Sequence, residues 1–425
     1  MKKFLLSTLV SAAALMGANV HAADLKIIHA GELLAVPGQG AKSEQSIIIE
    51  DGKISEVVNG YVNRDGAEIV DLKDSFVMPG MIDSHVHLTG QLSARGNPMQ
   101  TTKVDSAMMG LHYAEKTWQA GFTTVRNLGA DPEVIYGMRD AINKGLVQGP
   151  RIVASAGVSA TGGHGDIDGM KAELLDLYTS KTICDGPYDC RRAVRHAVKY
   201  GADWIKITST GGVLSDTATG VLQQMEDDEL KEIVKTAGRV GRDVASHAHG
   251  TQGINAALRA GVRSIEHGTY TDASSIKLFK ETGAYLVPTM LAGKFVADQA
   301  RANPNFFSDA IRPKALQVGS DMQANIEVAY KAGVKMAFGT DSGVSDHGDN
   351  AQEFILLNEI GVPNEEAIEM ATVRAAELLR MTDTLGTIAA GKHADIVATD
   401  GNPLNDIKEL LDVDFVMKGG KVVKH

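Results

Sequence analysis

The chain contains 425 residues, of which 44% are hydrophobic and 22% are charged, as is typical of folded globular proteins. Its formal net charge is -11, from 53 acidic and 42 basic residues, which argues against a nucleic-acid-binding protein with a basic surface. Aromatic residues make up only 5%, so a surface that stacks nucleic-acid bases is also disfavoured.

The N-terminus has the pattern of a secretory signal peptide. Residues 1–3 carry two lysines, an apolar run follows from Phe4 to about Ala18, and Val20-His21-Ala22 forms a small-x-small cleavage site. The run is short for a membrane span, and an uncleaved anchor is the less favoured alternative. We therefore expect residues 1–22 to be removed and the mature protein to be periplasmic or secreted, with no membrane span.

The chain has two cysteines, Cys184 and Cys190, whose spacing is not that of a zinc-binding C-x-x-C pair. Export would bring them into an oxidising compartment, where a loop disulfide is favoured. Two free thiols remain the alternative.

Short strands with alternating hydrophobicity are expected at both ends of the chain. Asp51-Gly52 separates two of them near the N-terminus and is a hairpin turn signal. Near the C-terminus, the strand Asp414–Met417 precedes a turn at Lys418–Lys421. We predict that residues 23–78 and 381–425 together form a small β-sandwich domain.

The central region, residues 79–380, alternates short apolar runs with amphipathic helical segments such as Asp227–Val240 and Gly253–Ala260. This repetition predicts a parallel sheet, most simply a (β/α)8 TIM-like barrel. A doubly wound sheet is the alternative, but neither G-x-G-x-x-G nor G-x-x-x-x-G-K-[ST] occurs. The apolar runs include Thr123–Val125, Arg151–Ala154, Trp204–Ile207, Val244–Ala245, Ser264–Ile265 and Met336–Phe338.

Polar side chains occur in the segment Met81–His87, expected to be the first barrel strand, and in the strand Trp204–Ile207. Asp83, His85 and His87 share one face because side chains alternate along a strand, and two imidazoles at a barrel mouth suit a divalent ion. Lys206 lies between two isoleucines that would face the helices, so it is expected to point into the barrel. Such a lysine either pairs with an acid such as Asp83 or reacts with carbon dioxide to give a carbamate that bridges two metal ions.

Three further strand ends carry candidate metal ligands. His247 and His249 end one strand, His267 ends the next, and Asp341 precedes a turn of small residues. A single histidine is usually structural, but repeated histidines at consecutive strand ends favour a metal centre.

The ordered pattern H-x-H … K … H … H … D resembles the binuclear metal-dependent amidohydrolase superfamily. Within it, the chain is most similar to the imidazolonepropionase-like branch, which includes Xaa-Pro dipeptidases and secreted carboxypeptidase-like dipeptidases. Asn127 departs from the aspartate of many relatives and is treated as a variation outside the ligand set. The segments that carry the resemblance are Val77–His87, Ala120–Arg126, Thr161–Asp166, His247–Gly250, Ala260–Gly268 and Leu385–Asp395.

The resemblance implies two divalent metal ions, with zinc as the default. His85, His87 and Asp341 would hold one ion, His247 and His267 the other, and N6-carboxylated Lys206 would bridge them. The implied reaction uses a hydroxide between the ions, a carbonyl polarised by the ion on His267, and Asp341 as proton shuttle.

By the same resemblance, His164 and His249 are expected to bind the substrate's terminal carboxylate, and His347 is a further substrate-binding candidate. We expect hydrolysis of dipeptides or N-acyl amino acids with a free C-terminal carboxylate, of the Xaa-Pro, Xaa-hydrophobic or Xaa-Arg/Lys type. The alternative enzyme is a hydrolase of a cyclic amide, lactone or phosphotriester on the same centre. A metal-storing or ligand-binding protein is the non-enzymatic alternative, and a homo-oligomer is possible.

Overall fold

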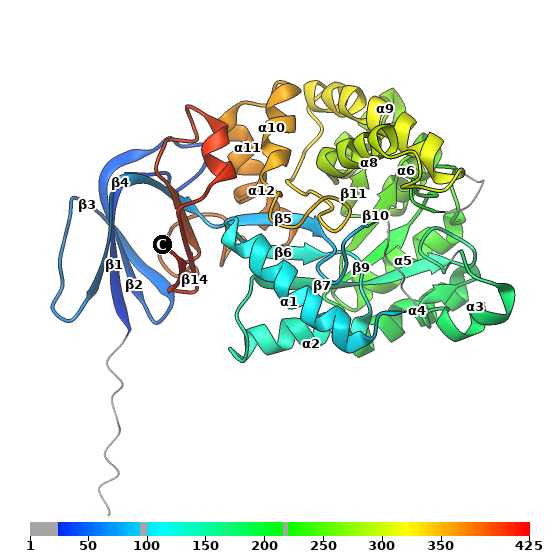
Figure 1. The fold of residues 1–425 in the computed structure, drawn as a ribbon, viewed down its shortest axis with the longest axis horizontal. Coiled ribbons are helices and arrows are strands. Elements are labelled where there is room, and N and C mark those ends of the chain that lie inside the picture. The colour runs from blue at the N-terminus through cyan, green and yellow to red at the C-terminus, as the bar shows by residue number, and fades with distance from the viewer. Residues whose placement is uncertain (1–23, 94–99, 168, 216–219) are drawn as a thin grey trace, which may run out of the picture.

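The computed structural model describes residues 24–93, 100–167, 169–215 and 220–425. The expected signal peptide, residues 1–22, lies outside the described residues. Figure 1 shows two parts: a small β-sandwich made from both ends of the chain, and a larger barrel of strands surrounded by helices. This arrangement confirms the predicted fold class.

The small domain contains a mixed seven-stranded sheet in the order β15-β14-β13-β4-β1-β2-β3. β1 and β4 pair in parallel, and the other neighbours are antiparallel. Both predicted turns are present, with positive φ angles at Asp51 and Gly52 and at Gly419 and Gly420. The strands are β1 (Leu25–Leu33), β2 (Lys42–Glu50), β3 (Lys53–Asn59), β4 (Glu68–Pro79), β13 (Ile396–Thr399), β14 (Phe415–Lys418) and β15 (Lys421–Lys424).

The barrel is a sheet of parallel strands in the order β12-β11-β10-β9-β7-β6-β5, with β8 paired to β7. The segment 336–342 closes it, since Met336 bridges Leu286 of β12 and Ser342 bridges Val86 of β5. The predicted strand at Met336–Phe338 therefore lies in the segment that closes the barrel, which is paired to its neighbours by isolated bridges. Its strands are β5 (Met81–Val86), β6 (Phe122–Asn127), β7 (Arg151–Ala160), β8 (Ile183–Cys184), β9 (Trp204–Thr208), β10 (Val244–Ala248), β11 (Ser264–His267) and β12 (Tyr285–Val287).

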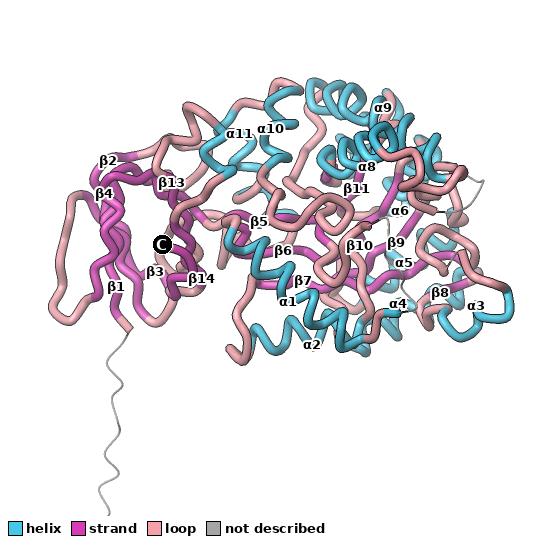
Figure 2. Tube along the Cα trace, in the orientation of Figure 1, coloured by secondary structure: helices cyan, strands magenta, loops and turns pink. Residues whose placement is uncertain are grey.

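Helices surround the barrel strands, as Figure 2 shows. Their bounds are α1 (Lys103–Gln119), α2 (Pro132–Asn143), α3 (Ala172–Tyr178), α4 (Gly186–Tyr200), α5 (Asp227–Arg239), α6 (Thr251–Ala260), α7 (Ala273–Thr282), α8 (Met290–Ala302), α9 (Ile311–Lys331), α10 (Gln352–Glu359), α11 (Asn364–Met370) and α12 (Val373–Leu378), with a 3-10 helix at Ile407–Leu411. None of the helices in the described part of the chain combines the length and apolarity needed to cross a bilayer.

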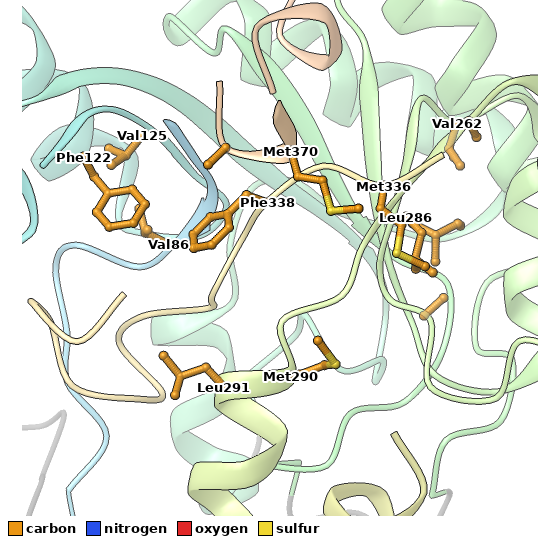
Figure 3. Close-up of a cluster of buried hydrophobic side chains, with 14 of the residues drawn as sticks. Val86, Phe122, Val125, Val262, Leu286, Met290, Leu291, Met336, Phe338 and Met370 are labelled. Atoms are coloured by element: carbon orange, nitrogen blue, oxygen red, sulfur yellow. The ribbon is translucent and has the colours of Figure 1, made fainter. Parts of the chain in front are cut away.

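The barrel core packs the closing segment against its neighbours. The rings of Phe122 and Phe338 stack 5.4 Å apart, and Met336 lies beside Leu286 (Figure 3). Ile205 and Ile207 are fully buried on either side of Lys206 in β9, as strand alternation predicts. This packing fixes the strands whose ends carry the polar residues.

A disulfide joins Cys184 of β8 to Cys190 of α4. The structure therefore contains the loop disulfide that the sequence left as one of two alternatives. It ties the short strand β8 to the helix that follows.

Candidate metal centre

The predicted metal-ligating residues converge at the carboxyl ends of the barrel strands. His85 lies in β5, Lys206 in β9, His247 in β10 and His267 at the end of β11, while Asp341 lies in the closing segment. The ring centres of His85 and His267 are 5.1 Å apart, and those of His247 and His267 are 4.6 Å apart. Parallel strands bring these side chains together because their carboxyl ends share one rim of the barrel.

One group of candidate ligand atoms comes from His85, His87 and Asp341. Oδ1 of Asp341 lies 3.3 Å from Nε2 of His85 and 3.1 Å from Nε2 of His87, and it is buried without a hydrogen bond. Nδ1 of His85 faces the Glu266 carboxylate at 2.9 Å, and Nδ1 of His87 faces the carbonyl of Gly129 at 3.0 Å. Both Nδ1 atoms face acceptors and therefore carry hydrogen, so Nε2 is the atom through which each ring could ligate a cation. Three converging ligand atoms fit a cation.

A second group consists of His247, His249 and His267, whose ligand nitrogens lie within 4.8 Å of one another. The Thr289 hydroxyl donates to the carbonyl of Pro288 and therefore accepts from Nδ1 of His267 at 2.7 Å. This bond leaves Nε2 of His267 with a lone pair. His267 also belongs to a group with His85 and Asp341, so the two ligand groups adjoin.

Lys206 lines the same site and is buried. Burial lowers the pKa of its ammonium to about 8, against the opposing charges of Glu266 and Asp341. No hydrogen bond or ion pair to Nζ of Lys206 is formed within the described residues. Asp83 does not pair with Lys206, because its carboxylate accepts from Thr340 Oγ1 at 2.7 Å and from Asn350 Nδ2 at 2.8 Å, and its other bonds are to backbone amides. The alternative of an Asp83 salt bridge is thus excluded.

Glu266 orients His85, a role that the sequence analysis did not assign. It is fully buried, accepts from His85, and pairs with the guanidinium of fully buried Arg126 at 2.8 Å. Burial acts to raise its pKa, but the charge of Arg126 and the bond from His85 lower that pKa to about 2. A carboxylate behind a ligating histidine fixes its tautomer and orientation. The feature of the sequence that could have indicated this role is the position of Glu266 directly before His267.

Backbone strain is concentrated at this centre. His267, Thr289 and Asp341 have positive φ angles of 71°, 52° and 59°, a region that non-glycine residues rarely adopt. Such residues cluster at functional sites, where surrounding contacts hold them.

A cavity of about 430 Å³ opens above the ligand groups. His164 and His249 line it, and burial lowers their pKa values to about 4 and about 3, so both rings are neutral near pH 7. Asp341 is the single carboxylate among the described residues that line the cavity. The aliphatic and thioether side chains of the wall belong to Leu128, Val158, Val213, Leu214, Val296, Val318, Met322 and Val344.

His347 does not line this cavity within the described residues. Its Nε2 lies 2.9 Å from the carbonyl of Gly90, and its ring stacks on Tyr113 with centres 4.5 Å apart. The turn after Asp341, with φ of 114° at Gly343, directs His347 towards the loop that follows β5. The structure therefore brings His164 and His249 to the site but not His347.

Comparison with known proteins gives one family and several relatives across most of the chain. The model of the amidohydrolase family matches residues 76–423. The ochratoxinase of Aspergillus niger is 32% identical over 436 residues, covering 96% of this chain and 88% of that protein. A solved Xaa-Pro dipeptidase with methionine bound in its active site is 40% identical, with a TM-score of 0.90 over 94% of this chain and 100% of that one. A solved prolidase in complex with N-methylphosphonate-L-proline is 32% identical, with a TM-score of 0.85 over 94% and 100% of the two chains.

Proposed function

The chain belongs to the amidohydrolase family, and we propose that it is a metal-dependent hydrolase of dipeptides or N-acyl amino acids with a free C-terminal carboxylate. That it hydrolyses amide bonds follows from the family and from its dipeptidase, prolidase and ochratoxinase relatives. The substrate class and the roles of individual residues are the proposal.

The observation that supports it most strongly is the convergence of Nε2 of His85, Nε2 of His87 and Oδ1 of Asp341 in a buried site. A cation held among these three atoms would compensate the burial of the carboxylate. His247 and His267 would hold a second cation beside the first. When bound, two divalent ions, with zinc as the default, would polarise the scissile carbonyl and lower the pKa of water.

We assign Lys206 a bridging role between the two ligand groups. Its lowered pKa leaves part of the amine neutral near pH 7, and a neutral amine can add to carbon dioxide and release one proton. The product is a carbamate anion with two oxygens, which suits a lysine that has no partner within the described residues. Carboxylation would thus replace a buried cation with a ligand.

Asp341 is the proposed proton shuttle. Its Oδ1 is buried without a hydrogen bond between Nε2 of His85 and Nε2 of His87, and the residue lines the cavity. A carboxylate there can accept a proton from the attacking water and then deliver it to the nitrogen of the leaving amine. With Nε2 of His85 and Nε2 of His87 bound to a cation and both Nδ1 atoms donating, these imidazoles would have no free lone pair to compete for this proton.

The cavity favours an apolar substrate side chain beside a carboxylate anchor. Neutral His164 and His249 can donate ring N–H groups to a terminal carboxylate. The wall offers no carboxylate other than Asp341 among the described residues, so a lysine or arginine side chain would be left unpaired. Of the expected substrate types, Xaa-Pro and Xaa-hydrophobic are therefore favoured over Xaa-Arg/Lys.

A panel of Xaa-Pro, Xaa-Leu and Xaa-Arg dipeptides, assayed with metal-loaded protein, tests the proposal. We expect turnover of the apolar members, weaker turnover of Xaa-Arg, and loss of turnover when the C-terminal carboxylate is amidated. Asp341→Asn should lose turnover while retaining much of its metal. Cleavage of lactones or phosphotriesters with no turnover of any dipeptide or N-acyl amino acid would contradict the peptidase assignment.

The N-terminal sequence supports a further proposal, that the enzyme acts in the periplasm or is secreted. Cleavage after Ala22 would leave Ala23 as the first residue of the mature protein. N-terminal sequencing of protein released by osmotic shock tests this. Retention of residues 1–22 in a cytoplasmic fraction would contradict it.

A further inference from the structure

Helix α8 begins without a cap from its own sequence. Its N-cap residue, Thr289, makes no side-chain capping bond. The hydroxyl is already used, because it accepts from Nδ1 of His267 and donates to the carbonyl of Pro288. The first backbone N–H groups of a helix need partners from outside its own hydrogen-bond ladder. The Thr289 hydroxyl therefore binds His267 and does not cap the helix that begins after it.

A carboxyl group from another helix supplies the missing cap. Glu353 of α10 is fully buried; its Oε1 accepts from the backbone N–H of Met290 at 3.0 Å and its Oε2 from that of Leu291 at 2.7 Å. Figure 3 shows Met290 and Leu291 at the start of α8. Burial raises the pKa of Glu353 to about 8, so the two hydrogen bonds to its oxygens, and not a negative charge, hold the residues that follow Thr289.

We propose that Glu353 is a positioning residue for His267, acting through Thr289. By holding Met290 and Leu291, it keeps Thr289 in its left-handed conformation. The Thr289 hydroxyl can then fix Nδ1 of His267, so that Nε2 points into the metal centre. The inference rests on the proposed role of His267 as a metal ligand.

The strain at Thr289 explains why an external anchor is needed. Thr289 is β-branched and has φ of 52°, which is costly for such a side chain. His267 also has a positive φ, of 71°, so the ligand and its acceptor both occupy strained backbone. Strained conformations persist only where neighbouring structure holds them. Glu353 provides that hold from a helix about 60 residues further along the chain.

A glutamine at position 353 tests the proposal with little change in shape. A carboxyl group offers two acceptor oxygens in either protonation state, whereas an amide offers one oxygen and a nitrogen that only donates. Glu353→Gln must therefore leave Met290 or Leu291 without its acceptor. Glu229 provides the matched control, because it is also buried and accepts from the backbone N–H groups of Gly186 and Glu226, away from the cavity lining.

The experiment compares zinc affinity of the wild type, Glu353→Gln and Glu229→Gln by competition with a chelator. We expect one of the two zinc sites to weaken about 10- to 100-fold in Glu353→Gln, as for other residues that support ligating histidines. Glu229→Gln should bind zinc as the wild type does. Combining Glu353→Gln with Thr289→Ala should add little to either single change, since both act on the same His267 bond.

Equal zinc affinity in Glu353→Gln and the wild type would overturn the positioning role alone. Full additivity with Thr289→Ala would also overturn it. A wild type that binds no divalent metal would overturn the proposed metal centre together with this inference.

If Glu353→Gln does not fold, hydrogen exchange of the wild-type protein tests the positioning role of Glu353. We expect the amides of Met290 and Leu291 to be protected, and to gain protection when zinc binds. Free exchange of these two amides, with or without zinc, would overturn the inference.

Discussion

Replacing Glu266 with glutamine should separate fold stability from metal binding. Three donors, from His85, Arg126 and Ser264, share the two oxygens of this carboxylate. An amide offers them a single oxygen, and it leaves the fully buried Arg126 guanidinium without a counter-charge. Breaking a buried ion pair on one side costs about 3–5 kcal/mol. A typical domain is stable by about 5–15 kcal/mol, so the loss should be large but measurable.

The assay pairs two readouts on Glu266→Gln and on the double variant Glu266→Gln/Arg126→Met. Urea unfolding of the metal-free proteins should show the single variant destabilised by about 3–5 kcal/mol and the double variant largely recovered. Zinc affinity should fall about 10- to 100-fold in both, because in both a neutral amide replaces the charged acceptor of His85. Recovery of zinc affinity in the double variant, or unchanged stability in the single variant, would refute the reasoning.

Lys206→Ala should reduce the zinc stoichiometry measured by elemental analysis. Wild-type protein reconstituted without carbon dioxide should recover little activity until bicarbonate is added. Full activity and metal content in Lys206→Ala would contradict the role of Lys206 as a bridge between the two metal ions. In Gly212→Ala the added Cβ would lie 2.2 Å from Cε1 of His164, so KM for carboxylate-bearing dipeptides should rise about tenfold or more with a smaller change in kcat. Val296→Glu places a carboxylate in the apolar wall and should lower kcat/KM for Xaa-Leu about tenfold or more relative to Xaa-Arg. Bonds from Arg191 and Lys235 lower the pKa of Glu232 to about 2, below its unfolded value of 4.5. The stabilisation that these bonds give is therefore complete above pH 4.5 and is lost as the pH falls towards 2. The difference in the free energy of unfolding between the wild type and Glu232→Gln, from urea unfolding, should close over that range, and a constant difference would count against the pairing.

The strand-end residues of the centre could be predicted because one rule places them. In a barrel of parallel strands all carboxyl ends meet at one rim, so His85, Lys206, His267 and Asp341 had to lie near each other once the alternating pattern was accepted. Alternation within β9 was enough to turn Lys206 inward, between two buried isoleucines. The confirmed fold class therefore followed from local periodicity.

The supporting residues could not be predicted in the same way. Glu353 acts on backbone N–H groups of a distant helix, and no periodicity identifies such a contact. Thr289 depends on a left-handed backbone that a β-branched residue rarely adopts. His347 follows Asp341 closely in sequence, yet the turn at Gly343 carries it to the neighbouring loop instead of the cavity. In each case tertiary packing, and not a local sequence pattern, decided the contact.

Locating the cations in crystals of zinc-loaded protein by anomalous scattering tests the metal centre most directly. We expect two peaks, one between His85, His87 and Asp341 and one beside His247 and His267, with the side chain of Lys206 between them. A single peak elsewhere in the molecule, or no peak after reconstitution with zinc and bicarbonate, would contradict the paired-cation centre.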